Sequence, residues 1–453
     1  MTTQRALSPF ETGYFSASAR FGSVPVAGMP LFVGSVVHGT VDADLLRRVL
    51  AELADVHPLL RCRVVTEGRD GGKTGSEGAL AFRLQDDFRP ELDVTDLTDV
   101  TDGGDAAYLR LINTRQDWTE GLFRGRLLRD GSSSRVVLII HHGIADGRSA
   151  FALLDEMWRR YTALASGTGL SVPVGRRLPD AVDTRLASVV SDAEADEFLD
   201  LVARGTAEGG PVPATLPPDG DGATDAPRDR FALDRVELDS ATTEALVATA
   251  RAHALTVNAL LCGAVLATVR AHLEPAAGAL PMLCGHAADL RSSLRPELSA
   301  STVLNCASGL GTMLAVDAGA DPVALAREVS ADVRAALARR DPGRFMLASQ
   351  RVRGEAEAAA LGVRPTIAVS NVGRIPRHPV PEGLTVVRDE GYAMAVGMPP
   401  KLTVFTYDGK LTAQVEYDTA VHGRERMGRL GRDLETTLRK VALTPAGSGV
   451  TTV

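Results

Sequence analysis

The chain has 453 residues, of which 45% are hydrophobic and 23% charged, as is usual for a globular protein of two or more domains. Its formal net charge of -8 argues against nucleic acid as the main partner, because phosphate binding requires clustered positive charge. The N-terminal segment lacks the pattern of a signal peptide, and no apolar run is long enough to span a membrane, so we expect a cytoplasmic protein.

The first half of the chain combines helical and strand patterns. Apolar residues spaced three and four apart predict a helix that is capped by Asp42 or Asp44 and ends near Pro58. The same spacing predicts helices at 106–113 and 148–166. Strands are predicted at 59–65, 79–84, 122–128 and 136–140. The last two flank the turn sequence DGSSS and are expected to pair as a hairpin, whereas residues 68–78 predict a solvated loop.

The second half repeats this mixture after a segment rich in glycine and proline. A polar helix is predicted at 192–203, and residues 209–227 predict a mobile linker or a crossover. Helices follow at 240–252, 257–272, 322–338 and 424–441. Strands are predicted at 231–238, 280–284, 303–308, 366–370, 384–387, 402–407 and 411–417.

Neither half shows a regular alternation of strand and helix. This pattern favours an α+β fold, with helices to one side of a sheet, over a doubly wound parallel fold. We therefore expect an N-terminal subdomain at 1–180, a crossover or linker at 181–230 and a C-terminal subdomain at 231–453.

The four cysteines are spread widely along the chain. Cys62, Cys262, Cys284 and Cys306 lie in apolar surroundings and have no CxxC spacing. This distribution predicts buried free thiols in a reducing compartment, and it indicates neither a disulfide framework nor a zinc site.

The stretch RVVLIIHHGIADG, from Arg135 to Gly147, carries the main chemical signal. His141 and His142 end a predicted strand, where successive side chains point to opposite faces, so only one imidazole can face a given cleft. An imidazole titrates near neutrality and can act as a general base. A lone histidine is more often a core residue, but the adjacent histidine and the following Asp-Gly favour a functional role for His142.

Asp146 and Gly147 have structural explanations as well. Asp146 could cap the helix that follows it, or form a buried ion pair with Arg291 or Arg295. Spacing alone does not place Asp146 against the imidazole, so no His-Asp dyad is assigned. Gly147 would allow a sharp turn or leave room for a substrate.

Other catalytic signatures are weak or missing. The chain has no GxSxG, GxxxxGK[ST] or HExxH motif, which disfavours a covalent serine enzyme and a nucleotide enzyme. The phrase SNVG, from Ser370 to Gly373, ends a predicted strand and could donate to an oxyanion or form a plain turn. The arginines of one basic stretch could contact an acidic carrier protein or form a solvated helix face; they are Arg334, Arg339, Arg340 and Arg344.

The motif from His141 to Gly147 resembles the HHxxxDG signature of the CoA-dependent acyltransferase superfamily. This group includes peptide-synthetase condensation domains, plant BAHD acyltransferases and bacterial polyketide-associated acyltransferases. Three further phrases resemble the same group: DLLRRVLAELADVHPLLR at 44–61, AADLR at 287–291 and SNVG at 370–373. The DFGWG of the plant branch is absent, and neither a carrier nor an adenylation domain is attached, so the chain most resembles the stand-alone polyketide-associated branch.

The resemblance implies two chloramphenicol-acetyltransferase-like subdomains in a V-shaped pseudo-dimer with a central channel. His142 would deprotonate an acceptor that attacks an acyl thioester directly, without an acyl-enzyme. Asp146 would be structural through Arg291, with His141 and Gly147 as further support. Ser370 and Asn371 would be the oxyanion candidates, and no metal would take part.

The resemblance also sets expectations for substrates and partners. It implies a monomeric O-acyltransferase of secondary metabolism or complex lipid assembly, without a tightly bound cofactor. The donor would be an acyl-CoA or a phosphopantetheinyl-carrier thioester, and the acceptor a small-molecule alcohol. An acyl carrier protein or a polyketide synthase would be the docking partner. Three alternatives stay open: amide-forming condensation, a non-acyl cyclising reaction, and a non-catalytic carrier-docking protein on the same fold.

Overall fold

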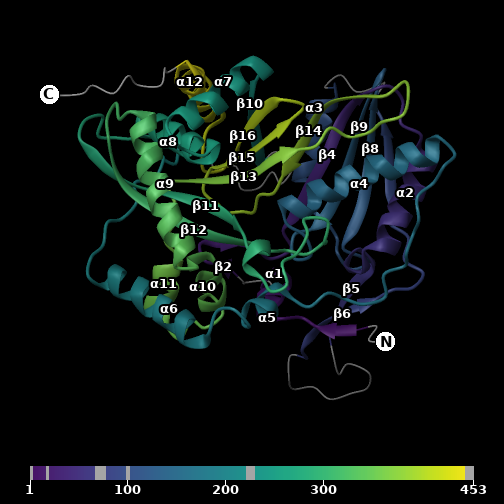
Figure 1. Ribbon diagram of the computed structural model, residues 1–453, viewed down its shortest axis with the longest axis horizontal. Helices are drawn as coiled ribbons and strands as arrows, with labels where there is room; N and C mark the ends of the chain where they lie inside the picture. The colour runs from purple at the N-terminus through teal and green to yellow at the C-terminus, as the bar shows by residue number, and fades with distance from the viewer. Residues whose placement is uncertain (1–3, 17–19, 67–77, 98–102, 221–229, 444–453) are drawn as a thin grey trace.

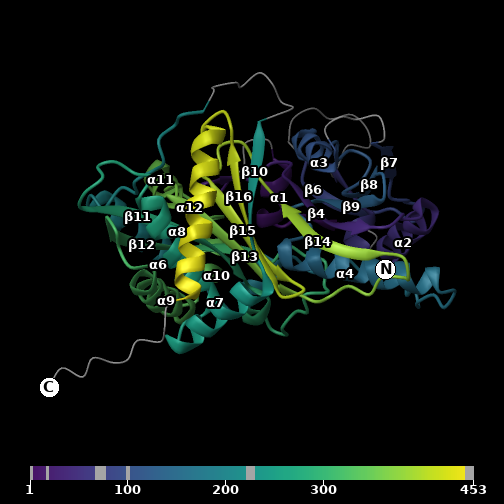
Figure 2. The same cartoon turned by 90° about the horizontal axis from the view of Figure 1, so that it is seen from above.

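The computed structural model describes residues 4–16, 20–66, 78–97, 103–220 and 230–443 (Figure 1). Two large mixed sheets, each covered by helices, lie side by side in both ribbon views (Figure 2). This arrangement confirms the predicted α+β fold.

The first half supplies one large sheet, two small sheets and several helices. Its strands are β1 (Gln4–Ala6), β2 (Arg20–Phe21), β3 (Val24–Pro25), β4 (Pro30–His38), β5 (Cys62–Thr66), β6 (Leu80–Leu84), β7 (Leu92–Asp96), β8 (Phe123–Asp130) and β9 (Ser133–His141). Its helices are α1 (Pro9–Phe15), α2 (Ala43–Val56), α3 (Gly103–Asn113), α4 (Gly147–Ala165), α5 (Val182–Leu186) and α6 (Asp192–Ala207).

The second half supplies the other large sheet. Its strands are β10 (Phe231–Leu238), β11 (Ala279–Asp289), β12 (Ala307–Asp317), β13 (Ile367–Ile375), β14 (Thr385–Tyr392), β15 (Lys401–Tyr407) and β16 (Lys410–Asp418). Its helices are α7 (Ser240–Ala252), α8 (Val257–Arg270), α9 (Pro322–Ala338), α10 (Asp341–Ala348), α11 (Glu355–Leu361) and α12 (Arg424–Ala442).

The five-stranded sheet has the order β14-β4-β9-β8-β7, and β8 and β9 form the predicted antiparallel hairpin. Alternate residues of β9 face opposite cores. Val136, Leu138 and Ile140 join the cluster that contains residues of α2 and α4, whereas Val137 and Ile139 pack with residues of α3. The continuous apolar run of this strand is therefore explained by burial of both faces.

Strand β14 comes from the second half of the chain but completes the sheet of the first half. It pairs antiparallel with β4, from Thr385 against His38 to Tyr392 against Phe32. The division into subdomains at 1–180, 181–230 and 231–453 stays a prediction. Strand β14 belongs to the third segment by sequence but to the sheet of the first segment in space.

The six-stranded sheet has the order β10-β16-β15-β13-β11-β12. Helices α7, α8, α9 and α12 pack on it, and α8 is buried along most of its length.

No single helix in the described ranges is long and apolar enough to span a membrane, although α7 and α8 together meet the length and composition criteria across a 100° bend.

Several predicted boundaries differ from the structure. Residues 58–61 form a short 3-10 turn before β5, because Pro58 favours a helical start. The predicted strand at 303–308 lies mostly before β12, which begins at Ala307 and runs to Asp317. Strand β13 continues through the SNVG phrase, which is therefore not a terminal turn. Strand β4 was not predicted from the sequence.

The crossover is anchored where the structure describes it. The backbone N–H of Ala214 donates to Pro281 O at 2.7 Å, and that of Gly220 donates to Val421 O at 2.9 Å. Leu216 is buried in the core of the second half. A mobile linker is therefore the wrong prediction for residues 209–220, while most of the predicted loop at 68–78 lies outside the described residues.

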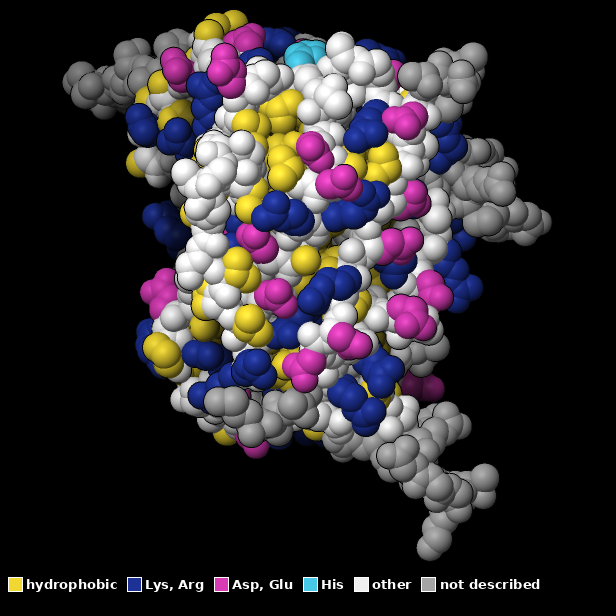
Figure 3. Space-filling view, turned by 90° about the vertical axis from the view of Figure 1, so that its right-hand side faces the viewer, with side chains coloured by type: hydrophobic (Ala, Val, Ile, Leu, Met, Phe, Trp, Pro, Cys, Tyr) yellow, Lys and Arg dark blue, Asp and Glu magenta, His cyan; other side chains and the backbone are white. Residues whose placement is uncertain are grey.

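Charges of both signs are mixed on the surface of the first half. Figure 3 shows basic and acidic side chains interspersed with apolar ones on the side of the molecule that forms the right-hand edge of Figure 1.

All four cysteines are buried and free of disulfide bonds, as predicted.

Candidate active site at the junction of the two halves

The hairpin places His141 and His142 at the end of β9, a central strand of the first sheet, on the side that faces the second half. His141 is the last residue of β9 and pairs with Pro30 of β4. The backbone N–H of His142 donates to Met29 O at 2.9 Å, just beyond that pairing. The backbones of both histidines are therefore held by hydrogen bonds at the end of a central strand.

His141 is a packing residue. Its ring stacks on Phe15, with ring centroids 4.1 Å apart, and meets the edge of Trp118. Its Nδ1 accepts a hydrogen bond from the backbone N–H of Gly143 at 3.0 Å. Burial, with a smaller contribution from His142, lowers the pKa of His141 to about 3, so the ring stays neutral and supports the loop.

His142 has different surroundings. The residue is only partly buried, and its ring lies nearly parallel to that of Tyr14, with ring centroids 5.7 Å apart. Its Nδ1 is buried and has no hydrogen-bond partner among the described residues, although a contact of the ring with the backbone carbonyl of His142 itself raises the pKa. That carbonyl also accepts from Asn305 Nδ2 at 2.9 Å, so Asn305 fixes the backbone of His142 from the other half.

The environment of His142 keeps its imidazole neutral. Burial lowers the pKa of His142 below its ordinary value of 6.5, and the positive charge of Lys401 adds to this shift. The carbonyl contact and the charge of Asp146 oppose the shift without reversing it. A neutral imidazole at pH 7 is the form that can accept a proton.

Asp146 performs both of the structural roles considered from the sequence. Its Oδ1 accepts from the backbone N–H of Ser149 at 2.9 Å, which caps α4. Its Oδ2 accepts from Arg291 Nη1 and from the backbone N–H of Cys306, both at 2.7 Å. Asp146 and Arg291 are buried, so a desolvated ion pair joins the start of α4 to the second half of the chain.

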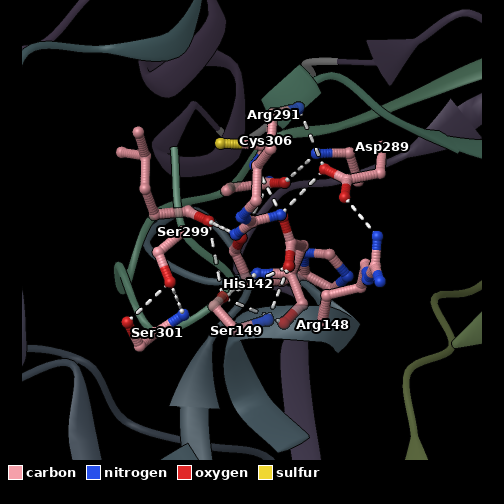
Figure 4. Close-up of polar contacts among 12 residues, drawn as sticks. His142, Arg148, Ser149, Asp289, Arg291, Ser299, Ser301 and Cys306 are labelled. Carbon is pink, nitrogen blue, oxygen red and sulfur yellow. Dashed lines mark hydrogen bonds and ion pairs between the residues drawn. The ribbon is translucent and has the colours of Figure 1, made fainter. Parts of the chain in front are cut away.

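Arg291 is the centre of a wider network at this junction (Figure 4). It also donates to Asp289 at 3.0 Å and to Leu304 O at 2.9 Å, while Asp289 pairs with Arg148 of α4 at 2.8 Å. Burial alone would lower the pKa of Arg291, but the neighbouring carboxylates raise it, so the guanidinium stays charged. Arg295, the other candidate partner, donates instead to nearby backbone carbonyls.

Gly147 begins α4 without unusual backbone geometry. A Cβ at this position would lie 3.5 Å from the side chain of Val372, an ordinary van der Waals distance. A sharp turn therefore does not explain this glycine. The contact instead shows that the start of α4 lies beside β13, the strand that carries Ser370 and Asn371.

The SNVG phrase forms a β-bulge. The register of β13 against β15 shifts between Asn371 and Gly373, and Gly373 has a φ of 96°, which favours glycine. The side chain of Asn371 donates to Asn258 at 3.1 Å and accepts from the backbone N–H of Gly373 at 2.9 Å. Since Asn371 is engaged in these internal bonds, the partly buried Ser370 is the better placed of the two candidate donors.

Two residues of the site carried no signal in the sequence. Tyr14 belongs to the short helix α1, and burial raises its pKa to about 12, against an opposing hydrogen bond with Asn305. Asn305 lies outside any recognised motif. Both reach His142 only through the tertiary fold, so periodicity and spacing could not have identified them.

The basic stretch considered as a carrier contact is largely neutralised by α6. Arg340 pairs with Glu194, and Arg344 pairs with Glu197 at 2.8 Å. Arg339 pairs with Asp341 at 2.6 Å. Arg340 and Arg344 thus hold α6 against the start of α10, whereas Arg334 and Arg339 are exposed, as expected of a solvated helix face.

Two shallow hollows in the surface lie away from His142. One is lined by residues around Asp105, Arg135 and Arg388, and the other by residues around Tyr161 and Gly383. The candidate site is defined by the contacts of His142 at the junction of the halves, and neither hollow is part of it.

Comparison with known proteins gives a consistent set of relatives. A family described as phthiocerol/phthiodiolone dimycocerosyl transferase C-terminus matches residues 227–416. A phthiocerol/phthiodiolone dimycocerosyl transferase of Mycobacterium leprae (strain TN) is 27% identical over 320 residues, which cover 67% of this chain and 68% of that protein. The protein of the same name from Mycobacterium ulcerans (strain Agy99) is 27% identical over 359 residues, or 78% of each chain.

Solved structures show the same fold. Polyketide synthase associated protein 5 from Mycobacterium tuberculosis aligns over 97% of this chain and 98% of its own, with a TM-score of 0.71 and 20% identity. The condensation domain from Monacolin K polyketide synthase MokA aligns over 98% of both chains, with a TM-score of 0.68 and 14% identity. These folds consist of two chloramphenicol-acetyltransferase-like subdomains, which agrees with the predicted architecture.

Proposed function

We propose that this chain, an acyltransferase of the CoA-dependent acyltransferase and condensation-domain superfamily, moves an acyl group from a thioester to an alcohol, with His142 as general base. The observation that carries this proposal is the setting of His142. The residue is partly buried at the junction of the two halves, is held by Met29 and Asn305, and keeps a neutral imidazole.

The proposed reaction requires a specific tautomer of His142. With the proton on Nδ1, which is buried, Nε2 presents its lone pair. Nε2 would take the proton of the acceptor hydroxyl as the oxygen attacks the thioester carbonyl carbon. When the C–S bond breaks, the imidazolium returns the proton to the departing thiolate. One base thus serves both transfers without an acyl-enzyme.

The negative charge that develops on the thioester oxygen needs a donor. The Ser370 hydroxyl is the candidate, because the β13 bulge lies beside the start of α4 and the amide of Asn371 is engaged elsewhere. Asn371 would act by shaping the bulge. Loss of one such donor typically costs about 10²- to 10³-fold in kcat.

The names of the relatives support a lipid substrate. They are transferases named for dimycocerosyl groups and for phthiocerol or phthiodiolone, which places them in complex lipid biosynthesis. We extend this class to the present chain as an O-acyltransferase of complex lipid or secondary metabolite assembly. The donor would be an acyl-CoA or a carrier-bound thioester, bound as a co-substrate.

The test is thioester turnover by purified protein. Release of free thiol and formation of ester are measured over a panel of acyl-CoA and acyl-carrier thioesters with lipid alcohols. We expect His142→Ala to reduce turnover by at least about 10²- to 10⁴-fold, the usual contribution of a general base. His38→Ala, at an exposed histidine of β4, is the control and should keep full activity.

The other outcomes are informative as well. Near-normal ester formation by a folded His142→Ala variant would exclude His142 as the base. Transfer to amines in preference to alcohols would indicate amide formation. If no thioester in the panel is consumed by the wild-type chain, a docking protein is the better explanation.

A further inference from the structure

A second cluster of reactive side chains lies in the core of the second half, away from His142. It consists of Cys262 on α8 and of Cys284 and His286 on β11, and all three residues are buried. The residues 284 and 286 point to the same face of β11, because side chains alternate along a strand. That face meets α8, which brings the three side chains together although 24 residues separate the first from the last.

We propose that Cys262, Cys284 and His286 bind a thiophilic d10 metal ion, Zn²⁺ or Cu⁺. Two sulfurs and an imidazole nitrogen are the ligands that these ions prefer. The sequence pattern does not indicate this site, because its two cysteines come from different elements and lack the close spacing of zinc motifs.

The distances fit a common metal ion. Nδ1 of His286 lies 3.6 Å from Cys262 Sγ and 4.0 Å from Cys284 Sγ, and all three ligand atoms lie within 4.8 Å of one another. Metal–sulfur bonds of about 2.3 Å and metal–nitrogen bonds of about 2.0 Å at tetrahedral or trigonal angles require a separation of about 3.5–3.7 Å between sulfur and nitrogen. The two sulfur–nitrogen distances therefore need to change by only a few tenths of an ångström for an ion to bind.

The imidazole of His286 is already oriented for binding. Its Nε2 lies 3.1 Å from the hydroxyl oxygen of Thr312 on β12, so Nε2–H can donate to that oxygen while the lone pair of Nδ1 faces the two sulfurs. Histidines that bind metals usually donate their second ring N–H to an oxygen in this way, which fixes the tautomer and the ring plane. The hydroxyl of Thr312 thus holds the imidazole of His286 in place for the proposed ion.

The site would act as a structural clamp. Strand β11 pairs with β13, with His286 opposite Val369, the neighbour of Ser370. On α8, Cys262 lies one turn after Asn258, the partner of Asn371. A metal ion would therefore fix α8 against β11 next to the bulge that carries the oxyanion candidates. The metal site itself does not depend on the proposed reaction.

The experiment measures metal binding by the full-length protein, purified under anaerobic, reducing conditions. Zn²⁺ and Cu⁺ are titrated separately in competition with a chromophoric chelator, and Co²⁺ is used as a spectroscopic probe of thiolate ligation. We expect the wild-type chain to bind about one ion per chain. The two titrations give the affinity of the site for each ion. Binding should become tighter as the pH rises, because the thiols lose their protons to the ion.

Variants separate the proposed ligands from the other thiols. Cys284→Ser and His286→Gln should lose the ion, whereas Cys62→Ser, at a buried cysteine of the first half, should bind as the wild type does. Thr312→Val keeps the ligands and the side-chain shape, and should weaken binding about 10- to 100-fold. This variant decides the matter if removal of a ligand prevents folding.

Three results would overturn the proposal. The first is folded wild-type protein that binds neither Zn²⁺ nor Cu⁺ in the competition assay. The second is binding retained by both Cys284→Ser and His286→Gln. The third is binding by Thr312→Val at wild-type strength. Either of the first two would mean that the cluster is only a hydrogen-bonded group of core side chains, and the third would mean that Thr312 does not orient His286 for an ion as proposed.

Discussion

The two adjacent histidines have different environments although both lie at the end of strand β9. His141 is enclosed by Phe15 and Trp118, whereas the partly buried His142 stacks beside Tyr14. Enclosure by apolar rings favours a packing role for His141, which leaves His142 as the proposed base. The difference arises from the alternation of side chains at the end of β9.

The pH dependence of activity should follow the lowered pKa of His142. The base works when its imidazole is neutral, so kcat/KM should rise with pH and reach a plateau below the ordinary histidine pKa of 6.5. Initial rates between pH 5 and pH 8 test this, with circular dichroism at each pH as a control for folding. An apparent pKa clearly above 6.5 would contradict the assignment.

Removing the charge of Asp146 should reduce stability as well as activity. In Asp146→Asn the cap to Ser149 can persist, but the buried guanidinium of Arg291 loses its closest carboxylate. Loss of one partner of a buried ion pair costs about 3–5 kcal/mol, and the lower end is expected because Asp289 still contacts Arg291. Denaturant unfolding measures the change in the free energy of unfolding.

A matched surface pair provides the control for this prediction. Asp93 pairs with Arg126 on the exposed side of the first sheet, so Asp93→Asn should cost less than about 1 kcal/mol. If Asp146→Asn lowers activity while its unfolding curve matches that of the wild type, the structural role of Asp146 is wrong.

At the level of elements, β14 is held in the first sheet by a buried charged network. His378 lies between Asp389 of β14, at 2.9 Å, and Asp155 of α4, at 3.1 Å. The other carboxylate oxygen of Asp389 accepts from Ser35 of β4 at 2.6 Å. Burial alone would lower the pKa of His378, but the hydrogen bonds and charges of both aspartates raise it to about 9.

This network predicts a loss of stability in alkaline solution. Because the pKa of His378 is higher in the folded state than its ordinary value of 6.5, the folded state binds the proton more tightly. The contribution is fully present below pH 6.5 and is lost as the pH rises through about 9. Urea unfolding between pH 6 and pH 9.5 should therefore show a decline of up to about 3 kcal/mol.

The variant His378→Gln should remove most of this decline. His38→Gln, at an exposed histidine of β4, should retain it. The role of His378 would be refuted if the wild type and His378→Gln had parallel curves of stability against pH.

At the scale of the whole molecule, the two halves share structure as well as a boundary. Strand β14 lies in the first sheet, and the main core of the first half includes Ile375, Phe405 and Tyr407 from the second half. The buried pair of Asp146 and Arg291 adds a charged connection. Such sharing couples the stability of one half to that of the other.

We therefore expect the halves to unfold together. The chain contains two tryptophans, Trp118 and Trp158, and both lie in the first half, so their fluorescence reports unfolding there. Far-ultraviolet circular dichroism also reports helices α8, α9 and α12 of the second half. The two denaturation midpoints should coincide. Separate midpoints would show that the halves are independent folding units.

Much of this protein could be read from local patterns. Strand β9, the hairpin turn and the cap of α4 depend on residues close together in the chain, so alternation, turn composition and capping predicted them. The HHxxxDG motif indicated the reaction class because its residues are contiguous. For Asp146, the spacing suggested a cap or an ion pair, and the structure contains both.

Other features depend on contacts between distant segments, which the sequence pattern does not encode. The tertiary structure alone placed β14 in the first sheet, Tyr14 and Asn305 beside His142, and Cys262 beside His286. It also chose Arg291 over Arg295 and paired the arginines of α10 with α6. The physical reason is that local sequence fixes which face of an element is apolar, whereas long-range packing decides which elements meet across that face.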